Sequence, residues 1–559
     1  MGIAVLVVGL MGLPLSGQGG VALGSPCSEA GRHLWSLAVA ADQWQVGEVP
    51  RRVAAVGWPV GLDAPLLDPV NVLVFAPLQA IFGSVWAWNL LVLSMPLVLG
   101  LGCWKLARAL RMSVLGGATL AVAAVGAPWL LQFGATGRSE YLPAALWPLW
   151  LACMVDARRG AVGAAVAGAL CLGLMLSGGP IITVFWAALS LPVLGLWLWR
   201  KPHREGALPL LSVVLGLVLA LPALLPVLRA LPQRAAGAMD GAGPGLVAPV
   251  QTSLATLFRW VPEALQPPTE QPATVALVLL VLGMVGAWHH RHARGWWLLG
   301  LWGLFLAQGT APTAAVDVHA APAVVQGPLA WLAQVVPPLS AISSWSRLGC
   351  LLGVSFGVAA ALAVDRVRGR WRWAVVALLG VALVDQSTNP RGIPRTDGAF
   401  SVSPPVAYLD ALGSVDAGPV MQLPMELPGP GACTGRGRWL LWSLAHDRPV
   451  TSTPAEVADT GVTMGFVGEM MRRVQDGRVR GPGAQDADAH DCLRESAQRL
   501  HSQGLAAVVV DTADPRGRDQ AAWLSAAWGP PVHTGRFQGW SLGGVPPPSR
   551  LVPVCRPPR

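Results

Sequence analysis

The sequence predicts an all-α polytopic membrane domain of about eleven transmembrane helices, followed by a smaller soluble α/β domain. The first observation behind this fold class is composition. Of the 559 residues, 53% are hydrophobic and only 12% are charged, whereas a soluble domain carries roughly 25% charged residues. The mean hydropathy is +0.51, so the chain lacks the polar surface that water requires. The second observation is that long apolar runs alternate with short basic clusters as far as residue 385.

These patterns divide the chain into three parts. Residues 1–385 are expected to form the transmembrane domain, with an outer loop at residues 24–71. Residues 386–398 form a polar linker, and residues 399–559 form the soluble domain.

A helix needs about 20 apolar residues to cross a bilayer, and fewer where the bilayer thins around it. Val72–Gly83 is apolar but short, which predicts a re-entrant or interfacial segment leading into the second span. The first apolar run lacks a preceding basic region, which argues against a cleaved signal peptide. The expected spans are Ile3–Leu23, Ser84–Ala107, Ser113–Phe133, Tyr141–Val155, Ala161–Ser177, Ile181–Trp199, Leu208–Leu228, Ala273–Trp288, Trp296–Ala307, Cys350–Val364 and Trp373–Val384.

The basic clusters indicate how these spans are oriented. They follow every even-numbered span, whereas the odd-numbered exits are poor in clustered Lys and Arg. Because cytoplasmic loops are the ones enriched in Lys and Arg, we expect a cytoplasmic N-terminus and an extracytoplasmic soluble domain in a bacterial inner membrane. The net charge of +9 is divided among these clusters, which argues against nucleic-acid binding. The clusters are Lys105, Arg108 and Arg111; Arg158 and Arg159; Arg200, Lys201 and Arg204; Arg291 and Arg294; and Arg366, Arg368, Arg370 and Arg372.

The outer loop, Gly24–Asn71, is the longest polar interruption in the first third of the chain. It interleaves carboxylates and one imidazole with tryptophans, a composition suited to a binding or catalytic cleft beside a membrane. These residues are Glu29, His33, Asp42, Glu48, Asp63, Asp68, Trp35, Trp44 and Trp58.

The soluble domain shows both strand and helix patterns. Pro419–Leu423 and Leu505–Asp511 are short apolar runs typical of buried strands. Arg438–Ala445 and Asp491–Gln503 have the periodicity of amphipathic helices.

The eight cysteines include no C-x-x-C pair, so neither a zinc site nor a thiol-redox motif is indicated. Cys27, Cys433, Cys492 and Cys555 are expected outside the membrane, where a disulfide can persist. Cys433–Cys492 is the first pair that we expect.

Four segments, taken in order, resemble the GT-C glycosyltransferase superfamily, including its YfhO-like and uncharacterised membrane glycosyltransferase-like groups. They are the acidic-x-x-x-H-L-W stretch at Glu29–Trp35, PVNVLVFAPLQAIFGSVWAWNLL at Pro69–Leu91, TGRSEYLPAALWPL at Thr136–Leu149, and PPLSAISSWSRL at Pro337–Leu348. Such proteins commonly have Asp four residues before the His, where this chain has Glu29.

The resemblance implies a membrane enzyme that transfers a sugar from a polyprenyl-phosphate donor to an envelope glycan, lipid or protein on the outer face. It implies Glu29 as the general base, assisted by His33, and Glu140 as a second carboxylate in the same compartment. The residues expected to bind substrate are Trp35, Asp63, Asp68, Arg138 and Arg347. The sequence requires no cofactor and has no metal-ligand spacing, although a divalent cation could bind Glu29, Asp63 or Asp68.

Simpler interpretations stand beside these. Glu29 and His33 could be interfacial polar residues, and Asp63 and Asp68 lie in turn contexts where Asp caps helices. Arg347 could extend its side chain to the interface without binding phosphate. The competing function is a non-enzymatic lipid or glycan transporter, a flippase or an envelope-assembly scaffold. Transporters usually contain two related halves with broken helices, and no such internal symmetry is visible.

Overall fold

The computed structural model describes residues 2–12, 20–24, 30–47, 52–53, 62–63, 69–127, 143–178, 207–240, 277–307, 349–387, 399–424, 438–446, 448–451 and 487–549, with seven single positions between 467 and 482. The chain divides into two compact units. Unit 1 comprises Met1–Ser25, Leu67–Phe400 and Gly429–Gly431. Unit 2 comprises Pro26–Leu66, Ser401–Pro428 and Ala432–Arg559.

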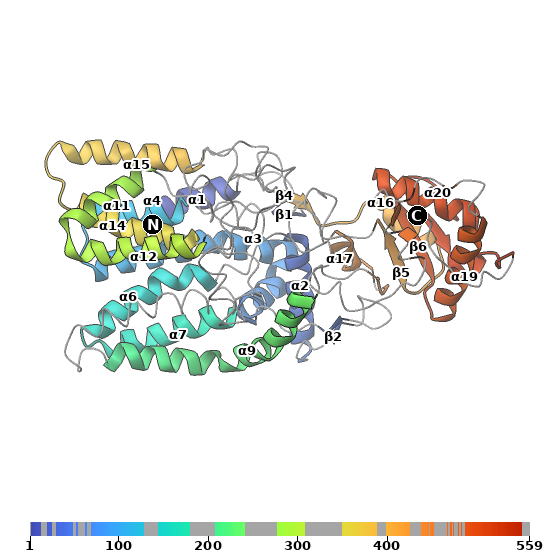
Figure 1. The fold of residues 1–559 in the computed structure, drawn as a ribbon, viewed down its shortest axis with the longest axis horizontal. Coiled ribbons are helices and arrows are strands. Elements are labelled where there is room, and N and C mark those ends of the chain that lie inside the picture. Colours follow the sequence, from blue (N-terminus) through green and yellow to red (C-terminus); the bar gives the residue numbers. More distant parts are fainter. Residues whose placement is uncertain are drawn as a thin grey trace. The chain divides into compact units, whose positions relative to one another are not determined.

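Unit 1 is a helical bundle (Figure 1). Its described helices are α1 (Gly2–Gly12), α3 (Pro69–Ala109), α4 (Val114–Val125), α6 (Trp147–Arg158), α7 (Val162–Gly178), α9 (Ala207–Asp240), α11 (Leu277–His289), α12 (Arg291–Ala307), α14 (Gly349–Val364) and α15 (Trp371–Ser387), with the 3-10 turn η3 (Pro143–Leu146) before α6. Two short strands, β1 (Val21–Leu23) and β4 (Ala399–Ser401), pair with each other.

One half of the bundle is built around α14, which packs against α4, α11 and α12. Glycine permits these close contacts, because a Cβ on Gly286 of α11 would collide with the carbonyl of Ala359. A Cβ on Gly353 of α14 would lie 2.8 Å from the carbonyl oxygen of Ala123. Small residues of this kind let helix backbones approach closely where lipid supplies no hydrophobic driving force.

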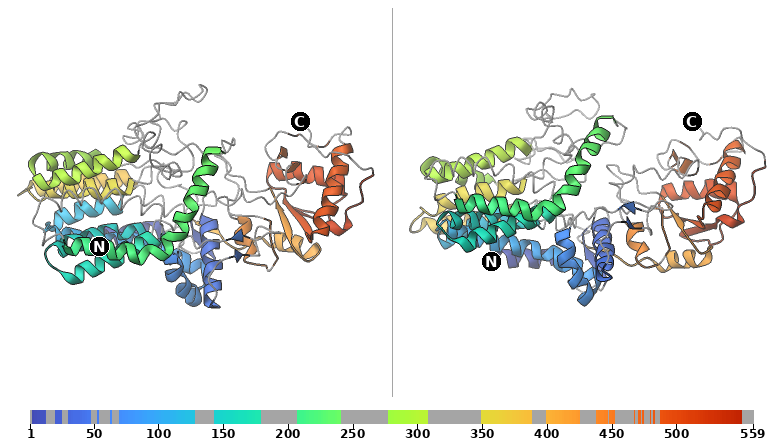
Figure 2. Two further views of the ribbon diagram at one scale, coloured as in Figure 1. Left: turned by 60° about the horizontal axis from the view of Figure 1, so that its bottom comes forward. Right: turned by 90° about the horizontal axis from the view of Figure 1, so that it is seen from below.

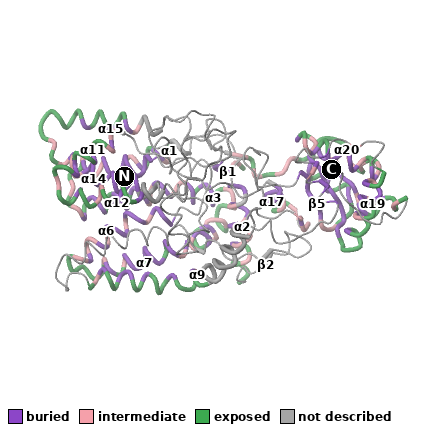
Figure 3. The backbone as a smooth tube through the Cα atoms, viewed as in Figure 1, coloured by how far each residue is buried: buried purple, intermediate pink, exposed green. Residues whose placement is uncertain are grey.

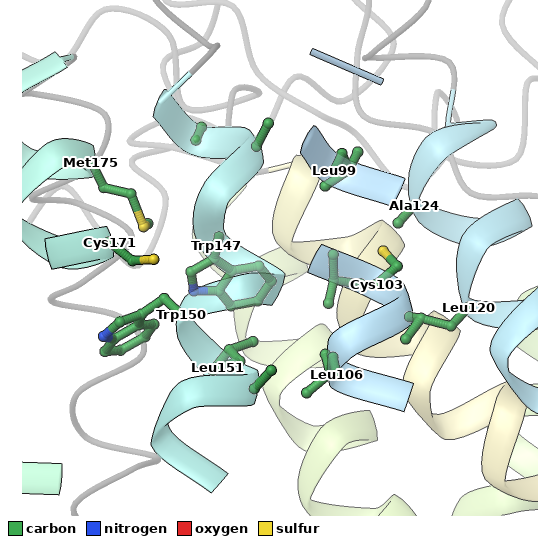
Figure 4. Packing of buried hydrophobic residues seen from close by; sticks show 14 of the residues in the cluster. Leu99, Cys103, Leu106, Leu120, Ala124, Trp147, Trp150, Leu151, Cys171 and Met175 are labelled. Atoms are coloured by element: carbon green, nitrogen blue, oxygen red, sulfur yellow. The ribbon is translucent and has the colours of Figure 1, made fainter. Parts of the chain in front are cut away.

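The other half packs α3, α6, α7 and α9 in chain order. Tryptophans fill the spaces between these helices. Figure 4 shows the indole of Trp147 pointing from α6 toward Cys103 and Leu106 of α3, while Trp150 lies beside Cys171 of α7. Each ring buries a large apolar area, so these two side chains contribute strongly to the packing of this half.

The outer faces of the bundle are exposed (Figure 3), and many of their exposed side chains are large and apolar. On α9, the exposed large aliphatic side chains range from 40% exposed (Leu215) to 60% exposed (Leu210). Among the described residues, Val70–Ala109 and Ala207–Leu225 are long and apolar enough to cross a membrane by length and composition. Shorter apolar helices are Val114–Val125, Val162–Gly178, Val278–His289, Leu352–Val364 and Trp371–Leu383. The count of about eleven spans stays a prediction.

Several expected helices are confirmed, with α7 at Val162–Gly178 the nearest match in bounds. The first expected span, Ile3–Leu23, is wrong at its end, because Val21–Leu23 is a strand. Ser113–Phe133 is too long by at least two residues, since the helix ends at Val125 and is followed by a non-helical Gly126. Ile181–Trp199 lies outside the described residues.

The break expected at Gly83 is confirmed. Within α3, Gly83 has φ 77° and ψ 164°, which separates Pro69–Phe82 from the helix that begins at Ser84. Only glycine adopts this conformation without strain. The first segment exposes apolar side chains such as Leu73 (51%) and Ile81 (71%), as an interfacial or lipid-facing segment requires.

Unit 2 contains a three-stranded mixed sheet of β5 (Val420–Leu423), β6 (Ala507–Asp511) and β7 (Phe537–Ser541). β5 and β6 are parallel, with Val420 opposite Ala507, and β7 runs antiparallel to β6, with Phe537 opposite Asp511. All five residues of β6 are buried. The helices are α16 (Val406–Ser414), α17 (Arg438–Ser443), α19 (Ala487–Ser502) and α20 (Pro515–Trp528), and η9 (Leu542–Gly544) follows β7.

The expected strands and helices of this domain are confirmed within a few residues, and α16, α20 and β7 add to them. Helices α19 and α20 lie side by side, and α20 packs on β6 (Figure 2). Asp491 of α19 accepts hydrogen bonds from Ser549 and Arg494, which hold the pKa of that carboxyl below its usual range. Cys492 is disulfide-bonded, and its partner lies outside the described residues, so the Cys433–Cys492 pairing stays a prediction.

The expected outer loop differs from the sequence interpretation. It contains α2 (Ala30–Gln45) and the antiparallel strands β2 (Arg52–Val53) and β3 (Leu62–Asp63), and Asn71 is already inside α3. Residues Pro26–Leu66 belong to unit 2, where α2 packs against α17. The segment is therefore a folded insertion shared with the C-terminal domain. The sequence interpretation had assigned it to the transmembrane domain.

Candidate functional site

One end of unit 1 carries several basic turns. Figure 1 shows the α6–α7, α11–α12 and α14–α15 turns at one end of the bundle. The α3–α4 turn joins them, because Asp365 accepts hydrogen bonds from the backbone and hydroxyl of Ser113. The structure thus gathers four of the five basic clusters at one end. Burial, together with the charge of Arg366, lowers the pKa of His290, so this imidazole is neutral at neutral pH.

Three segments converge at the end of unit 1 where α7 finishes. Gly178, the last residue of α7, is buried against η3 and the start of α3. A Cβ on Gly178 would collide with the ring of Pro143 and lie 3.0 Å from the Cβ of Val70. Val70 and Pro143 therefore both lie against the position that a side chain of Gly178 would occupy.

The same end carries an anchored strand. Asn89 of α3 accepts a hydrogen bond from the Leu23 N–H (2.7 Å) and donates one to the Val21 carbonyl (2.9 Å). The indole N–H of Trp88 donates to the Leu23 carbonyl at 2.7 Å. Both side chains are buried, so these bonds are shielded from solvent and hold β1 on α3. Asn89 lies in a segment that carried the family resemblance, but its positioning role was not foreseen.

We expect Gly178→Ala to destabilise the protein by about 1–3 kcal/mol, the usual cost of an extra methyl group in a packed site. The clash with Pro143 would displace η3 and the chain that precedes it. Thermal unfolding of the full-length protein in detergent measures the effect.

Gly163→Ala is the matched control, because it lies on the same helix and a Cβ there meets nothing within 4 Å. Its free energy of unfolding is expected to stay unchanged or to rise by up to about 1 kcal/mol, because alanine has a higher helix propensity than glycine. Equal unfolding midpoints for the two variants would show that the convergence at Gly178 is not tightly packed.

Most of the site residues expected from sequence lie outside the described part of the chain: Glu29, Asp68, Arg138, Glu140 and Arg347. His33 and Trp35 lie on α2 in unit 2, where His33 is half-buried and Trp35 is only 3% exposed. Asp63 is in β3, opposite Arg52 of β2. The roles of all these residues stay predictions.

Unit 2 has a polar cluster at the carboxyl end of its parallel strands, a common ligand position in α/β sheets. Asp511 ends β6 and is bridged by the Arg536 guanidinium at 3.1 and 3.2 Å. Asp514 caps α20 through the Arg516 N–H at 2.9 Å. Its other carboxylate oxygen is buried and has no hydrogen-bond partner among the described residues. The V-V-V-D-T-A-D sequence could have indicated this strand end, but the sequence interpretation did not use it.

A second buried network in unit 2 is fully paired. Tyr408 receives a hydrogen bond from the Gln422 amide at 2.6 Å and lies 3.1 Å from Nε2 of His446. The rings of Trp439 and Phe537 pack around it. Burial raises the pKa of Tyr408, so it stays a neutral phenol. This network stabilises the core and offers no free group for chemistry.

Within the described ranges, no three His, Cys, Asp or Glu side chains are grouped as a metal site would require. The divalent cation considered for Glu29, Asp63 or Asp68 remains untested, because those side chains lie outside the described set.

No protein-family model matches the sequence, and no curated protein matches it. The structure is similar to the cryo-EM structure of the arabinofuranosyltransferase AftD from Mycobacteria, with a TM-score of 0.54 and 16% identity over 97% of this chain. This chain spans 39% of the length of that protein. It is also similar to ArnT from Cupriavidus metallidurans in the apo state, with a TM-score of 0.50, 14% identity and coverage of 98% of both chains.

At these identities the likeness establishes the fold. The chain has a GT-C-like fold, the fold of polytopic membrane glycosyltransferases. The exposed apolar faces of unit 1 agree with this fold, because they require a hydrocarbon environment. The YfhO-like label stays a sequence resemblance.

Proposed function

We propose that this chain is an integral membrane glycosyltransferase that transfers a sugar from a polyprenyl-phosphate donor to an envelope acceptor on the outer face. The observation that carries the proposal is the convergence of α3, η3 and α7 at Gly178, at the end of a GT-C-like bundle away from the basic turns. AftD is an arabinofuranosyltransferase, and ArnT has also been solved bound to undecaprenyl phosphate. A lipid-linked sugar donor is the substrate class that these names support.

Two of the carboxylates expected from sequence lie close along the chain to the described residues of this convergence. Asp68 comes two residues before Val70, and Glu140 comes three residues before Pro143. This closeness in sequence supports the proposal that both carboxylates act at this end of the bundle, and Arg138 comes two residues before Glu140 in the chain.

The proposed chemistry is a glycosyl transfer. An acceptor hydroxyl attacks the anomeric carbon, the bond from that carbon to the phosphate oxygen breaks, and the lipid phosphate leaves with the electron pair. A carboxylate takes the proton of the attacking hydroxyl. We assign Glu29 as this base with His33 beside it, and Glu140 and Asp68 as groups that orient the sugar. Arg138 and Arg347 would neutralise the phosphate, because guanidinium groups bind phosphate oxygens in pairs.

The proposed orientation has three supports. Cytoplasmic turns are rich in Lys and Arg, which assigns the basic turns to the cytoplasm. Asn89 precedes Ala109 by about 20 residues, a rise of about 30 Å in a helix, so β1 is anchored about one hydrocarbon thickness away from those turns. Disulfides persist outside the cytoplasm, and Cys492 of unit 2 forms one. A location in the bacterial inner membrane, with unit 2 on the extracytoplasmic side, fits all three observations.

The test is transfer of labelled sugar by full-length protein in lipid vesicles supplied with polyprenyl-phosphate sugars. The proposal predicts release of polyprenyl phosphate in proportion to sugar transferred. Saturable binding of the lipid donors without any release would favour the transporter, flippase or scaffold alternative. Absence of both binding and release would reject a lipid-linked substrate.

A further inference from the structure

The four turns gathered at one end of unit 1 contain all the net charge of the chain. We name residues 105–113, 156–161, 288–294 and 365–373 the basic end. They hold 11 of the 39 Lys and Arg residues and only 2 of the 30 Asp and Glu residues, so the remaining chain has 28 of each sign against a total net charge of +9. The clusters are separate along the sequence, but folding brings them to one end of the bundle (Figure 1).

The basic end is exposed and held in a defined arrangement. Ten of its Lys and Arg side chains are exposed, with Arg158 half-buried. Arg366 donates to the His289 carbonyl at 2.9 Å, and Arg294 donates to the Ala287 carbonyl at 2.9 Å. The first bond ties the α14–α15 turn to the α11–α12 turn, and the second lies within the α11–α12 turn. Both aspartates are already engaged, Asp365 by Ser113 and Asp156 by Arg159 at 3.1 Å.

Exposed tryptophans surround these charges. Trp104, Trp288, Trp371 and Trp373 are 41%, 77%, 63% and 77% exposed. The Lys105 ammonium and the Arg108 guanidinium lie 5.4 and 5.3 Å from the ring of Trp104. Tryptophan prefers the headgroup level of a bilayer, where its ring is in apolar surroundings and its N–H is hydrated. The positions of these rings therefore indicate that the neighbouring basic side chains lie at the depth of the lipid phosphates in the bilayer.

We propose that the basic end is a binding surface for anionic phospholipid headgroups. A bilayer surface fits better than a nucleic acid or an acidic protein, because the rings continue the exposed apolar faces of the bundle, and a headgroup layer covers both the rings and the charges. Each Lys or Arg near an anionic leaflet strengthens the attraction about fivefold. The inference is independent of the glycosyl-transfer proposal, since it concerns the opposite end of the bundle.

The test uses full-length protein in detergent, titrated with phosphatidylglycerol or phosphatidylcholine and read by native mass spectrometry. The variant is Arg368→Gln with Arg370→Gln, two exposed residues of the α14–α15 turn. We expect its affinity for phosphatidylglycerol to fall about 25-fold, with unchanged affinity for phosphatidylcholine. The matched control, Arg368→Lys with Arg370→Lys, keeps both charges and should bind like the wild type.

Three results would overturn the proposal. The first is wild-type protein that binds the two lipids equally. The second is a Gln variant that keeps its phosphatidylglycerol affinity, or a Lys variant that loses it. The third is displacement of phosphatidylglycerol by millimolar inorganic phosphate, which would indicate a site for free phosphate. Unfolding midpoints in phosphatidylcholine, expected to be equal for all three proteins, show that each variant is folded.

Discussion

Glu29→Gln is expected to lower sugar transfer at least about 100-fold, the lower end of what a positioned general base contributes. Glutamine has nearly the same shape as glutamate but cannot take the proton of the acceptor hydroxyl. Donor binding should persist, because the proposed phosphate contacts involve Arg138 and Arg347. The measurement is turnover of labelled polyprenyl-phosphate sugar by full-length protein in vesicles, beside a binding assay with the same donor.

Asp42→Asn is the matched control. Asp42 is an exposed carboxylate on α2, in the same folded insertion, and has no proposed part in the chemistry. It should turn over at the wild-type rate. If Glu29→Gln also keeps that rate, the base is elsewhere, and Glu140→Gln should then show the loss. Loss of donor binding in Glu29→Gln would instead show that Glu29 holds the substrate.

The helices of unit 1 could be predicted because their surroundings are uniform. In a bilayer, a continuous apolar run is enough to specify a helix, and α7 was predicted to within one residue at each end. The break in α3 was also predictable, because Gly83 punctuates an otherwise apolar segment. The end of the first expected span, Ile3–Leu23, could not be predicted. Val21–Leu23 is as apolar as the helices and forms a strand through contacts with distant partners, Asn89 and β4.

The folded insertion and the candidate site depended on contacts that no local pattern records. Packing of α2 on α17 joins segments about 400 residues apart. The convergence at Gly178 brings three segments together at a residue where glycine, which lacks a Cβ, leaves room for them. In unit 2, α20 had a readable signal that was not used, because Asp514 followed by Pro515 is a typical N-cap and first helical residue. The strand β7 was obscured by the glycine and polar residues in FQGWS.

Gly517→Ala is expected to destabilise unit 2 by about 3 kcal/mol or more, the upper end of the cost of overpacking. Gly517 is in the first turn of α20, where a Cβ would collide with the carbonyl oxygen of Asp511 and lie 3.5 Å from Cδ of Pro424. A side chain could rotate away from such a collision, but this oxygen belongs to the backbone of β6. That strand pairs with β5 on one side and β7 on the other, and Arg536 holds the Asp511 carboxylate.

Hydrogen exchange of the full-length protein locates the effect, because it reports opening segment by segment. Peptides covering β6 and α20 should exchange far faster in Gly517→Ala, while α7 in unit 1 should keep its wild-type rate. Gly413→Ala is the control on α16, where a Cβ meets nothing within 4 Å and alanine should be neutral or stabilising. Unchanged exchange in β6 would mean that α20 shifts off the sheet at little cost. The close approach of α20 to the ends of β5 and β6 would then not be what stabilises unit 2.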